Sequence, residues 1–212
     1  MQMQLVADEL AVIRGERIVF AGLSFTVSEG EALILTGPNG SGKTTLIRTI
    51  AGFIRPADGE LRLEAGDAER TLGQHCHYVG HRNAVKSSMT VLENIAFWRN
   101  YLARDSIDRL PGRDGAALDT FGLLELSDIP AGYLSDGQKR RLGLARLLLT
   151  RRPIWLLDEP TASLDAASQG VLDAVIDRHL WSGGIALIAT HQPIDVASQR
   201  ELRLGTTDVE AA

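Results

Sequence analysis

The apolar residues of this chain follow two patterns, and the first is typical of β-strands. Residues 5–12 and 18–27 carry strand-type side chains on either side of a turn, which predicts an antiparallel hairpin. Unbroken apolar or β-branched runs occur at 33–36, 154–157 and 185–189. Such runs are typical of parallel strands that are buried on both faces. Shorter strands are expected at 61–63, 78–79 and 202–204.

The second pattern has helical spacing. It begins near Lys43, dominates residues 89–150, and returns in a long helix for which Asp165 is the expected N-cap. Residues 105–114 contain proline, glycine and several charges, and predict a loop. The tail from Gly205 onward is expected to be frayed. Strands and helices that alternate in this way predict an α/β fold with a mostly parallel sheet.

A glycine-rich turn connects the run at 33–36 to the first helix. It matches G-x-x-x-x-G-K-[ST], the pattern of a phosphate-binding loop, and the flanking strand and helix disfavour a turn that binds nothing. Glycines let successive N–H groups point inward, and the helix N-terminus adds roughly half a positive charge. Lys43 supplies an ammonium for the β- and γ-phosphates, and Thr44 a hydroxyl for Mg²⁺. The predicted contacts to a Mg-nucleotide are Gly37, Pro38, Asn39, Gly40, Ser41, Gly42, Lys43, Thr44 and Thr45.

Composition favours a cytosolic globular protein. The 212 residues contain no run close to the ~18 apolar residues of a membrane span, and Cys76 is the single cysteine, which excludes an internal disulfide. The N-terminus lacks the basic and then apolar order of a signal peptide, so secretion is not expected. The net charge of −5 argues against a nucleic-acid partner, since phosphate neutralisation usually requires a basic face.

Two clusters suggest functions that the sequence does not support. His75 and His77 flank Cys76, but a closed metal site needs four ligands, so we interpret this segment as ordinary strand. The basic run Lys139-Arg140-Arg141 has the look of a nucleic-acid patch. Because such a run on a helix usually forms a solvated face, we predict that it makes no contact.

Two later segments bring further chemistry. The run at 154–157 ends in Asp158 and Glu159, which predicts a buried strand whose carboxyl end carries a Mg²⁺ ligand and a group that orients or deprotonates water. The alternative, a solvated strand end, fits poorly after four buried residues. Ser135 is expected to cap a helix whose N-terminus faces outward and can bind an anion. His191 ends the last apolar run and can bond a γ-phosphate; the alternative is a satisfied core histidine.

Taken together and in this order, the motifs resemble those of the ATP-binding subunits of ABC transporters along essentially the whole chain. Residues 37–44 resemble Walker A, residues 154–158 resemble Walker B, and His191 resembles the switch histidine. The signature motif is matched by Leu134, Ser135, Asp136, Gly137 and Gln138, with Asp136 in place of the usual glycine, and the D-loop by Ser163, Leu164 and Asp165.

The resemblance implies a P-loop NTPase fold and an ATPase with Lys43, Glu159 and His191 as catalytic residues, and Thr44 and Asp158 as Mg²⁺ ligands. It also implies one ABC ATPase domain over residues 1–212. Residues 1–80 and 151–212 then form the nucleotide-binding core with an antiparallel β subdomain, and residues 81–150 form an inserted helical subdomain that carries the signature.

The partners implied by the resemblance are a second copy and membrane proteins. In a head-to-tail homodimer, Ser135 and Gly137 of one copy close over the γ-phosphate that Lys43 of the other copy holds. Integral membrane subunits dock on the helical subdomain, which places the chain at the cytoplasmic face of the inner membrane as a peripheral subunit.

Two departures from the family pattern point to a branch of it. Arg14 stands where the family usually stacks an aromatic ring on adenine, and its planar guanidinium can stack there instead. His81 stands where the family has a glutamine, and can reach the metal or a water. The segment around His81 is similar to that of the haem-exporter ATPases of cytochrome c biogenesis. Open alternatives are a transporter of another small substrate, a non-transport ABC ATPase, and a nucleotide sensor, which intact Glu159 and His191 disfavour.

Overall fold

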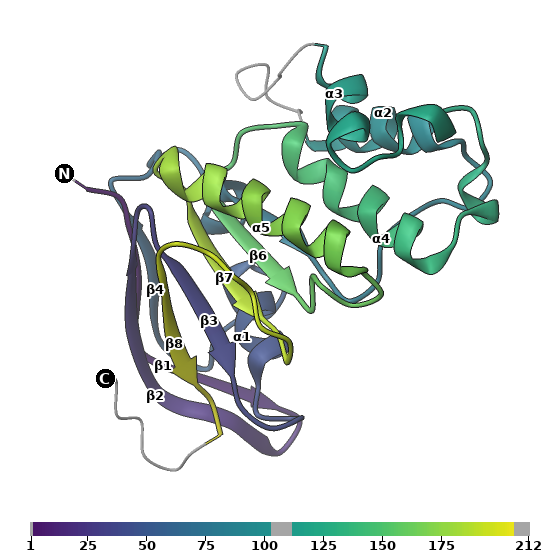
Figure 1. The fold of residues 1–212 in the computed structure, drawn as a ribbon. Helices are drawn as coiled ribbons and strands as arrows, with labels where there is room; N and C mark the ends of the chain where they lie inside the picture. The colour runs from purple at the N-terminus through teal and green to yellow at the C-terminus, as the bar shows by residue number, and fades with distance from the viewer. Residues whose placement is uncertain (1, 103–111, 206–212) are drawn as a thin grey trace.

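The central sheet is parallel and has five strands. A computed structural model describes residues 2–102 and 112–205 and orders these strands β5-β6-β7-β3-β8, with every neighbouring pair parallel. Their bounds are β3 Ala32–Thr36, β5 Cys76–Val79, β6 Ile154–Asp158, β7 Ile185–Ala189 and β8 Gln199–Arg203. The carboxyl ends of all five strands therefore meet at one edge of the sheet, as the apolar runs predicted (Figure 1).

A second sheet is antiparallel and contains the predicted hairpin. Strands β1 (Gln4–Arg14) and β2 (Arg17–Ser28) pair around the turn at Gly15, and β4 (Asp58–Glu64) pairs with the other edge of β1. This sheet lies along one side of the molecule in Figure 1. The fold is thus the α/β architecture that the sequence predicted.

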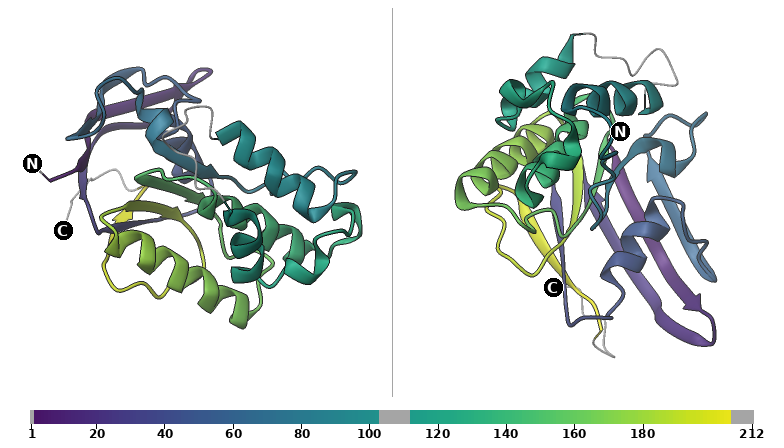
Figure 2. Two further views of the ribbon diagram at one scale, coloured as in Figure 1. Left: turned by 90° about the horizontal axis from the view of Figure 1, so that it is seen from above. Right: turned by 90° about the vertical axis from the view of Figure 1, so that its right-hand side faces the viewer.

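Helix α1 (Lys43–Ile50) packs between the two sheets, and helix α5 (Ala166–Trp181) covers the opposite face of the parallel sheet (Figures 1 and 2). The alternation along β3 explains both layers: Leu33 and Leu35 face the core that contains α1, while Ile34 packs against the core that contains α5. Buried parallel strands need apolar residues on both faces, which is why these runs are continuous.

A helical region projects beyond the sheet; in the sequence it lies between β5 and β6. It contains α2 (Val91–Leu102), α3 (Arg113–Thr120) and α4 (Asp136–Ala145), and Figure 2 shows it extending away from the antiparallel sheet. Single 3-10 turns lie at Leu72–His75, Leu124–Leu126, Ala131–Tyr133 and Arg146–Leu148.

Two details differ from the sequence predictions or escape them. The predicted loop 105–114 ends earlier than expected, because α3 begins at Arg113. Residues 103–111, and the tail from 206 onward, lie outside the described residues. His75 belongs to a 3-10 turn, so the prediction of strand there was wrong. Its Nε2 lies 3.1 Å from the Asp67 carbonyl oxygen.

We expect this fold to lose stability in mild acid, because burial lowers the pKa of His77 to about 3 and the pKa of His179 to about 4. In the unfolded chain both imidazoles take up a proton near pH 6.5. As the pH falls below that value, the unfolded state is favoured by up to about 1.4 kcal/mol per pH unit for each histidine. The free energy of unfolding in urea should therefore fall between pH 7 and pH 5.

A matched variant isolates one of these two groups. The His179 ring stacks on Trp155 with centroids 3.9 Å apart, so His179→Phe keeps the ring contact and removes the titration. The variant should show about half of the wild-type pH dependence. An unchanged slope would mean that His179 does not contribute to it.

Candidate nucleotide-binding and catalytic site

The turn between β3 and α1 has the backbone geometry of a phosphate cradle. Gly37, Gly40 and Gly42 have φ values of 125°, 80° and 106°. A Cβ atom at Gly37 would lie 2.2 Å from the Leu204 carbonyl oxygen, and one at Gly42 would lie 2.9 Å from a Val19 methyl carbon. Only glycine fits these two positions, since both the space and the left-handed backbone exclude a side chain.

Lys43 lies at the mouth of this turn and points back over it. Its Nζ donates to the carbonyl oxygens of Gly37 (2.7 Å) and Pro38 (3.2 Å), and the residue is 7% exposed. The ammonium is thus held above the inward-facing backbone, where it adds a full charge to the partial charge of the α1 N-terminus. This arrangement can bind a polyphosphate.

Asp158 and Thr44 form a pair that fits a divalent cation. Thr44 Oγ1 donates to Asp158 Oδ1 over 2.9 Å, which joins the first residues of α1 to the carboxyl end of β6. Asp158 is 2% exposed, and its Oδ2 is buried without a hydrogen-bond partner among the described residues. An unpartnered buried carboxylate oxygen beside a hydroxyl is a hard oxygen donor set of the kind Mg²⁺ prefers.

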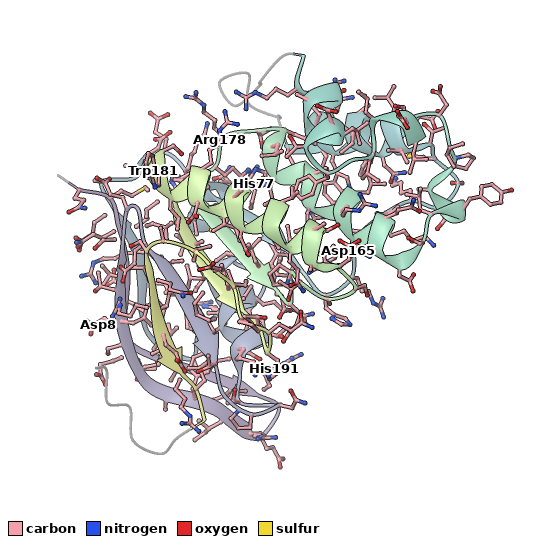
Figure 3. All side chains as sticks on the ribbon, viewed as in Figure 1. Asp8, His77, Asp165, Arg178, Trp181 and His191 are labelled. Atoms are coloured by element: carbon pink, nitrogen blue, oxygen red, sulfur yellow. The ribbon has the colours of Figure 1, made fainter. Side chains whose placement is uncertain are left out.

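Glu159 and His191 lie side by side at the same edge. The ring atom Nε2 of His191 is 3.6 Å from Glu159 Oε1. The main-chain N–H of His191 donates to Glu159 Oε2 over 3.4 Å. Glu159 has a φ of +50°, and its own N–H donates to the Ala189 carbonyl oxygen over 2.7 Å. The strand thus ends in a left-handed residue, which is uncommon for a side chain larger than glycine and frequent at functional sites. Figure 3 labels His191, at the end of β7 beside the phosphate turn.

These residues border one cavity of about 730 Å³. Its walls bring together most of the predicted site residues, which are Arg14, Asn39, Gly40, Ser41, Gly42, Lys43, Thr44, Thr45, His81, Asp158, Glu159 and His191. Gly37 and Pro38 take part through the carbonyl groups that hold Lys43. Arg17 and Val19 of β2 also line the cavity, and the sequence did not single them out because they belong to no motif. Ala162, the first residue of the segment that resembles the D-loop, lines the cavity as well.

The signature segment does not line the cavity of its own chain. Ser135 caps α4, accepting from the Gln138 N–H over 3.2 Å, and both Ser135 and Asp136 are exposed. Gly137 packs against Ser163, since a Cβ atom there would lie 2.8 Å from the Ser163 carbonyl oxygen. The signature helix and the D-loop therefore touch each other and form a surface away from the phosphate turn.

The contacts of the basic run 139–141 differ from the sequence prediction. We expected it to make no contact, and this was wrong for two of its three residues. Arg140 is 2% exposed and donates five hydrogen bonds to groups at the catalytic edge, while Arg141 donates to the Phe121 carbonyl oxygen over 2.8 Å. A run of three like charges does not reveal which member faces inward; the helical phase counted from Ser135 would have put Arg140 beside Leu144, on the buried side.

Comparison with solved structures defines the class of fold as an ABC ATPase domain. A putative ABC transporter ATP-binding protein from Pyrococcus furiosus superposes with a TM-score of 0.77 at 22% identity, covering 93% of this chain and 96% of that one. A bacterial Atm1-family ABC exporter with ATP bound gives 0.77 at 24% identity, covering 96% of this chain and 37% of that one.

Sequence comparison gives the family. The family model described as ABC transporter matches residues 20–162, and the chain belongs to that family as an ATPase subunit. It is 46% identical over 208 residues to a protein from Agrobacterium fabrum named cytochrome c biogenesis ATP-binding export protein CcmA, with 95% of both chains covered. A protein of the same name from Nitrobacter winogradskyi is 48% identical over 205 residues, which cover 96% of this chain and 98% of that one.

Replacing Lys43 should weaken nucleotide binding. We expect Lys43→Ala to raise the dissociation constant for ATP by about tenfold or more, because the variant lacks the full charge above the phosphate turn. Isothermal calorimetry on the full chain measures this directly. An unchanged dissociation constant would contradict the assignment of the cradle.

Proposed function

We propose that this chain is the ATP-hydrolysing subunit of a transporter complex that handles haem during cytochrome c biogenesis. The observation that carries the proposal is the 46–48% identity, over 95% or more of the chain, to proteins named as ATP-binding export proteins of that process. None of the described helices is long and apolar enough to span a bilayer, so the proposal includes separate membrane subunits and a peripheral place for this chain at the cytoplasmic face of the inner membrane.

The proposed mechanism follows from the edge geometry. The N–H groups of residues 37–44 and Lys43 hold the β- and γ-phosphates of ATP. Thr44 and Asp158 would hold Mg²⁺, which would offset charge on the transferred phosphoryl group. Water attacks the γ-phosphorus, the bond to the β-phosphate oxygen breaks, and Glu159 accepts the proton from the water. His191, 3.6 Å from Glu159, donates to the γ-phosphate.

The proposal assigns less specific roles to two further residues of the cavity. Arg14 borders it at the end of β1, next to the turn at Gly15, where a planar guanidinium can stack on adenine. His81 borders it just after β5 and can contact the metal or a water.

The proposed active form is a head-to-tail dimer. The exposed tip of α4, with Ser135 as N-cap, is an anion site without a phosphate cradle in its own chain, and this supports a role in closing over the nucleotide of a second copy. The D-loop, Ser163 to Asp165, packs beside that tip and would lie at the same interface. ATP would then hold the two copies together, and hydrolysis would release them.

A second cavity, of about 680 Å³, is called the groove below. It supports docking of a membrane subunit on the helical subdomain, which we propose to comprise residues 81–150. It lies between α1 and α2, and two of its aromatic residues are largely exposed, Phe53 at 66% and Tyr101 at 58%. Arg48 and Arg82 add positive charge. We propose an apolar helix with acidic residues as its occupant.

Glu159→Gln should separate binding from turnover. The amide can still accept a hydrogen bond but cannot take a proton from water at neutral pH, so we expect ATP to bind with an affinity close to that of the wild type while turnover falls by about a hundredfold or more. Gel filtration with Mg-ATP should then show a trapped dimer. Turnover at the wild-type rate would rule out Glu159 as the base, and a monomer under these conditions would count against the head-to-tail dimer.

A negative charge introduced in the groove should weaken the binding of the membrane subunits. We expect Phe53→Glu to reduce by about tenfold the membrane proteins recovered with a tag on this chain, because a carboxylate repels an acidic, apolar partner. Trp181→Glu is the matched control, since Trp181 is 88% exposed on α5 and does not line the groove. Equal recovery with both variants would contradict the docking site. The identity of the recovered proteins tests the role in cytochrome c biogenesis, and partners of another transport system would overturn it.

A further inference from the structure

Arg140 is a buried cation that no motif assigned to the site. It lies in the second turn of α4, five residues after Ser135, and is 2% exposed. Its nearest acids, Asp158 and Glu159, offer it their main-chain carbonyl groups rather than their carboxylates. Burial lowers the pKa of Arg140 to about 10, opposed by the charges of Asp158 and Glu159, so the group is a cation at neutral pH.

The guanidinium uses all five of its N–H bonds, and it uses them on two separate segments. Nε donates to the Pro160 carbonyl oxygen over 3.0 Å, and Nη2 donates to the carbonyl oxygens of Asp158 (3.2 Å) and Glu159 (2.6 Å). Nη1 donates to the Gly80 carbonyl oxygen (3.0 Å) and to Asn83 Oδ1 (3.1 Å). One planar group thus fixes three consecutive peptides after β6 and the segment after β5.

These contacts fix the main chain at Glu159, whose backbone conformation is unusual. Glu159 has a φ of +50°, a left-handed conformation that is strained for a non-glycine residue. The Glu159 N–H is held by Ala189 on β7, and its carbonyl oxygen is held by Arg140. The direction of the Glu159 carboxylate therefore depends on the position of α4.

We propose that Arg140 is a positioning residue for hydrolysis. It orients the Glu159 carboxylate and makes this orientation depend on the positions of the signature helix α4 and of the segment 80–83. The inference rests on the proposed catalytic role of Glu159. When α4 moves against a second copy, or when a docked membrane subunit moves the segment 80–83 beside the groove, the same guanidinium transmits the shift to the main chain of Glu159. Arg140 touches neither the nucleotide cavity nor its phosphate turn.

The test is the split between ATP binding and turnover. Arg140→Lys keeps the charge, but a single ammonium has three N–H donors and cannot span both segments. We expect kcat of the transporter complex, purified through a tag on this chain, to fall by about ten- to a hundredfold, the scale of loss for a misplaced catalytic group. The ATP dissociation constant of the full chain should stay within about twofold, because the phosphate turn is untouched.

Arg141→Lys is the matched control on the same helix. The Arg141 side chain donates to the Phe121 carbonyl oxygen over 2.8 Å, within the helical region and away from Glu159, so kcat should change by less than about twofold. A folded Arg140→Lys complex with wild-type kcat overturns the proposal. So does a loss in Arg141→Lys as large as that in Arg140→Lys.

A second variant keeps the proposal testable if Arg140→Lys does not fold. Asn83→Ala removes one acceptor from the guanidinium and should lower kcat by about two- to fivefold with the same ATP affinity, less than Arg140→Lys, because the other four hydrogen bonds of the guanidinium remain. Where both variants fold, the double variant should lose less than the product of the two single losses, because both changes act through one group. Independent, multiplied losses, or an Asn83→Ala complex with unchanged kcat, contradict the coupling.

Glu159→Gln in the same assay distinguishes the two levels of the argument. If Glu159→Gln retains turnover, the catalytic assignment of Glu159 is wrong. If Glu159→Gln is inactive while Arg140→Lys is fully active, only the role of Arg140 is overturned.

Discussion

The hydrogen bond between Thr44 and Asp158 is the contact around which the site is arranged. It joins the start of α1, the helix that follows β3, to the end of β6, and β7 lies between β3 and β6 in the sheet. It is possible because parallel strands end at one edge, so the phosphate turn after β3 and the acids after β6 face the same space. Lys43 at the start of α1, Glu159 just after β6 and His191 just after β7 border the same cavity as this bond.

Polar groups at this edge are buried, and each burial needs a partner. Thr44 donates to Oδ1 of Asp158, while Oδ2 is buried without a hydrogen-bond partner among the described residues. The main-chain carbonyl groups of residues 158–160 accept hydrogen bonds from Arg140. An isolated buried charge would be very costly, whereas a guanidinium with all five donors satisfied stabilises the turn that it crosses. The helical region is therefore tied to the catalytic strand by hydrogen bonds as well as by packing.

The two cavities meet at the segment after β5. His81 lines both the nucleotide cavity and the groove between α1 and α2, and Gly80 gives its carbonyl oxygen to Arg140. A displacement of this segment at the groove would reach the nucleotide cavity through the His81 side chain and through the main chain. This contiguity gives a physical basis for coupling between the proposed catalytic site and the proposed docking site.

The sequence by itself determined the strands, the phosphate turn and the caps. Their signals are local: apolar period, glycine where φ is positive, and Ser135 or Asp165 before a helix, where a side chain bonds an N–H three residues on. The family motifs indicated which segments distant in sequence come together in the candidate site. Even so, the sequence assigned Arg140 to solvent, because all five of its acceptors lie 18 to 60 positions away along the chain.

Only the tertiary structure decided which charges are buried and which surfaces remain open. The groove beside Phe53 and the contact of Gly137 with the Ser163 carbonyl group both arise from chain segments far apart in sequence. The physical reason is that burial and hydrogen-bond satisfaction belong to the packed assembly, whereas turn and strand preferences belong to a few neighbouring residues.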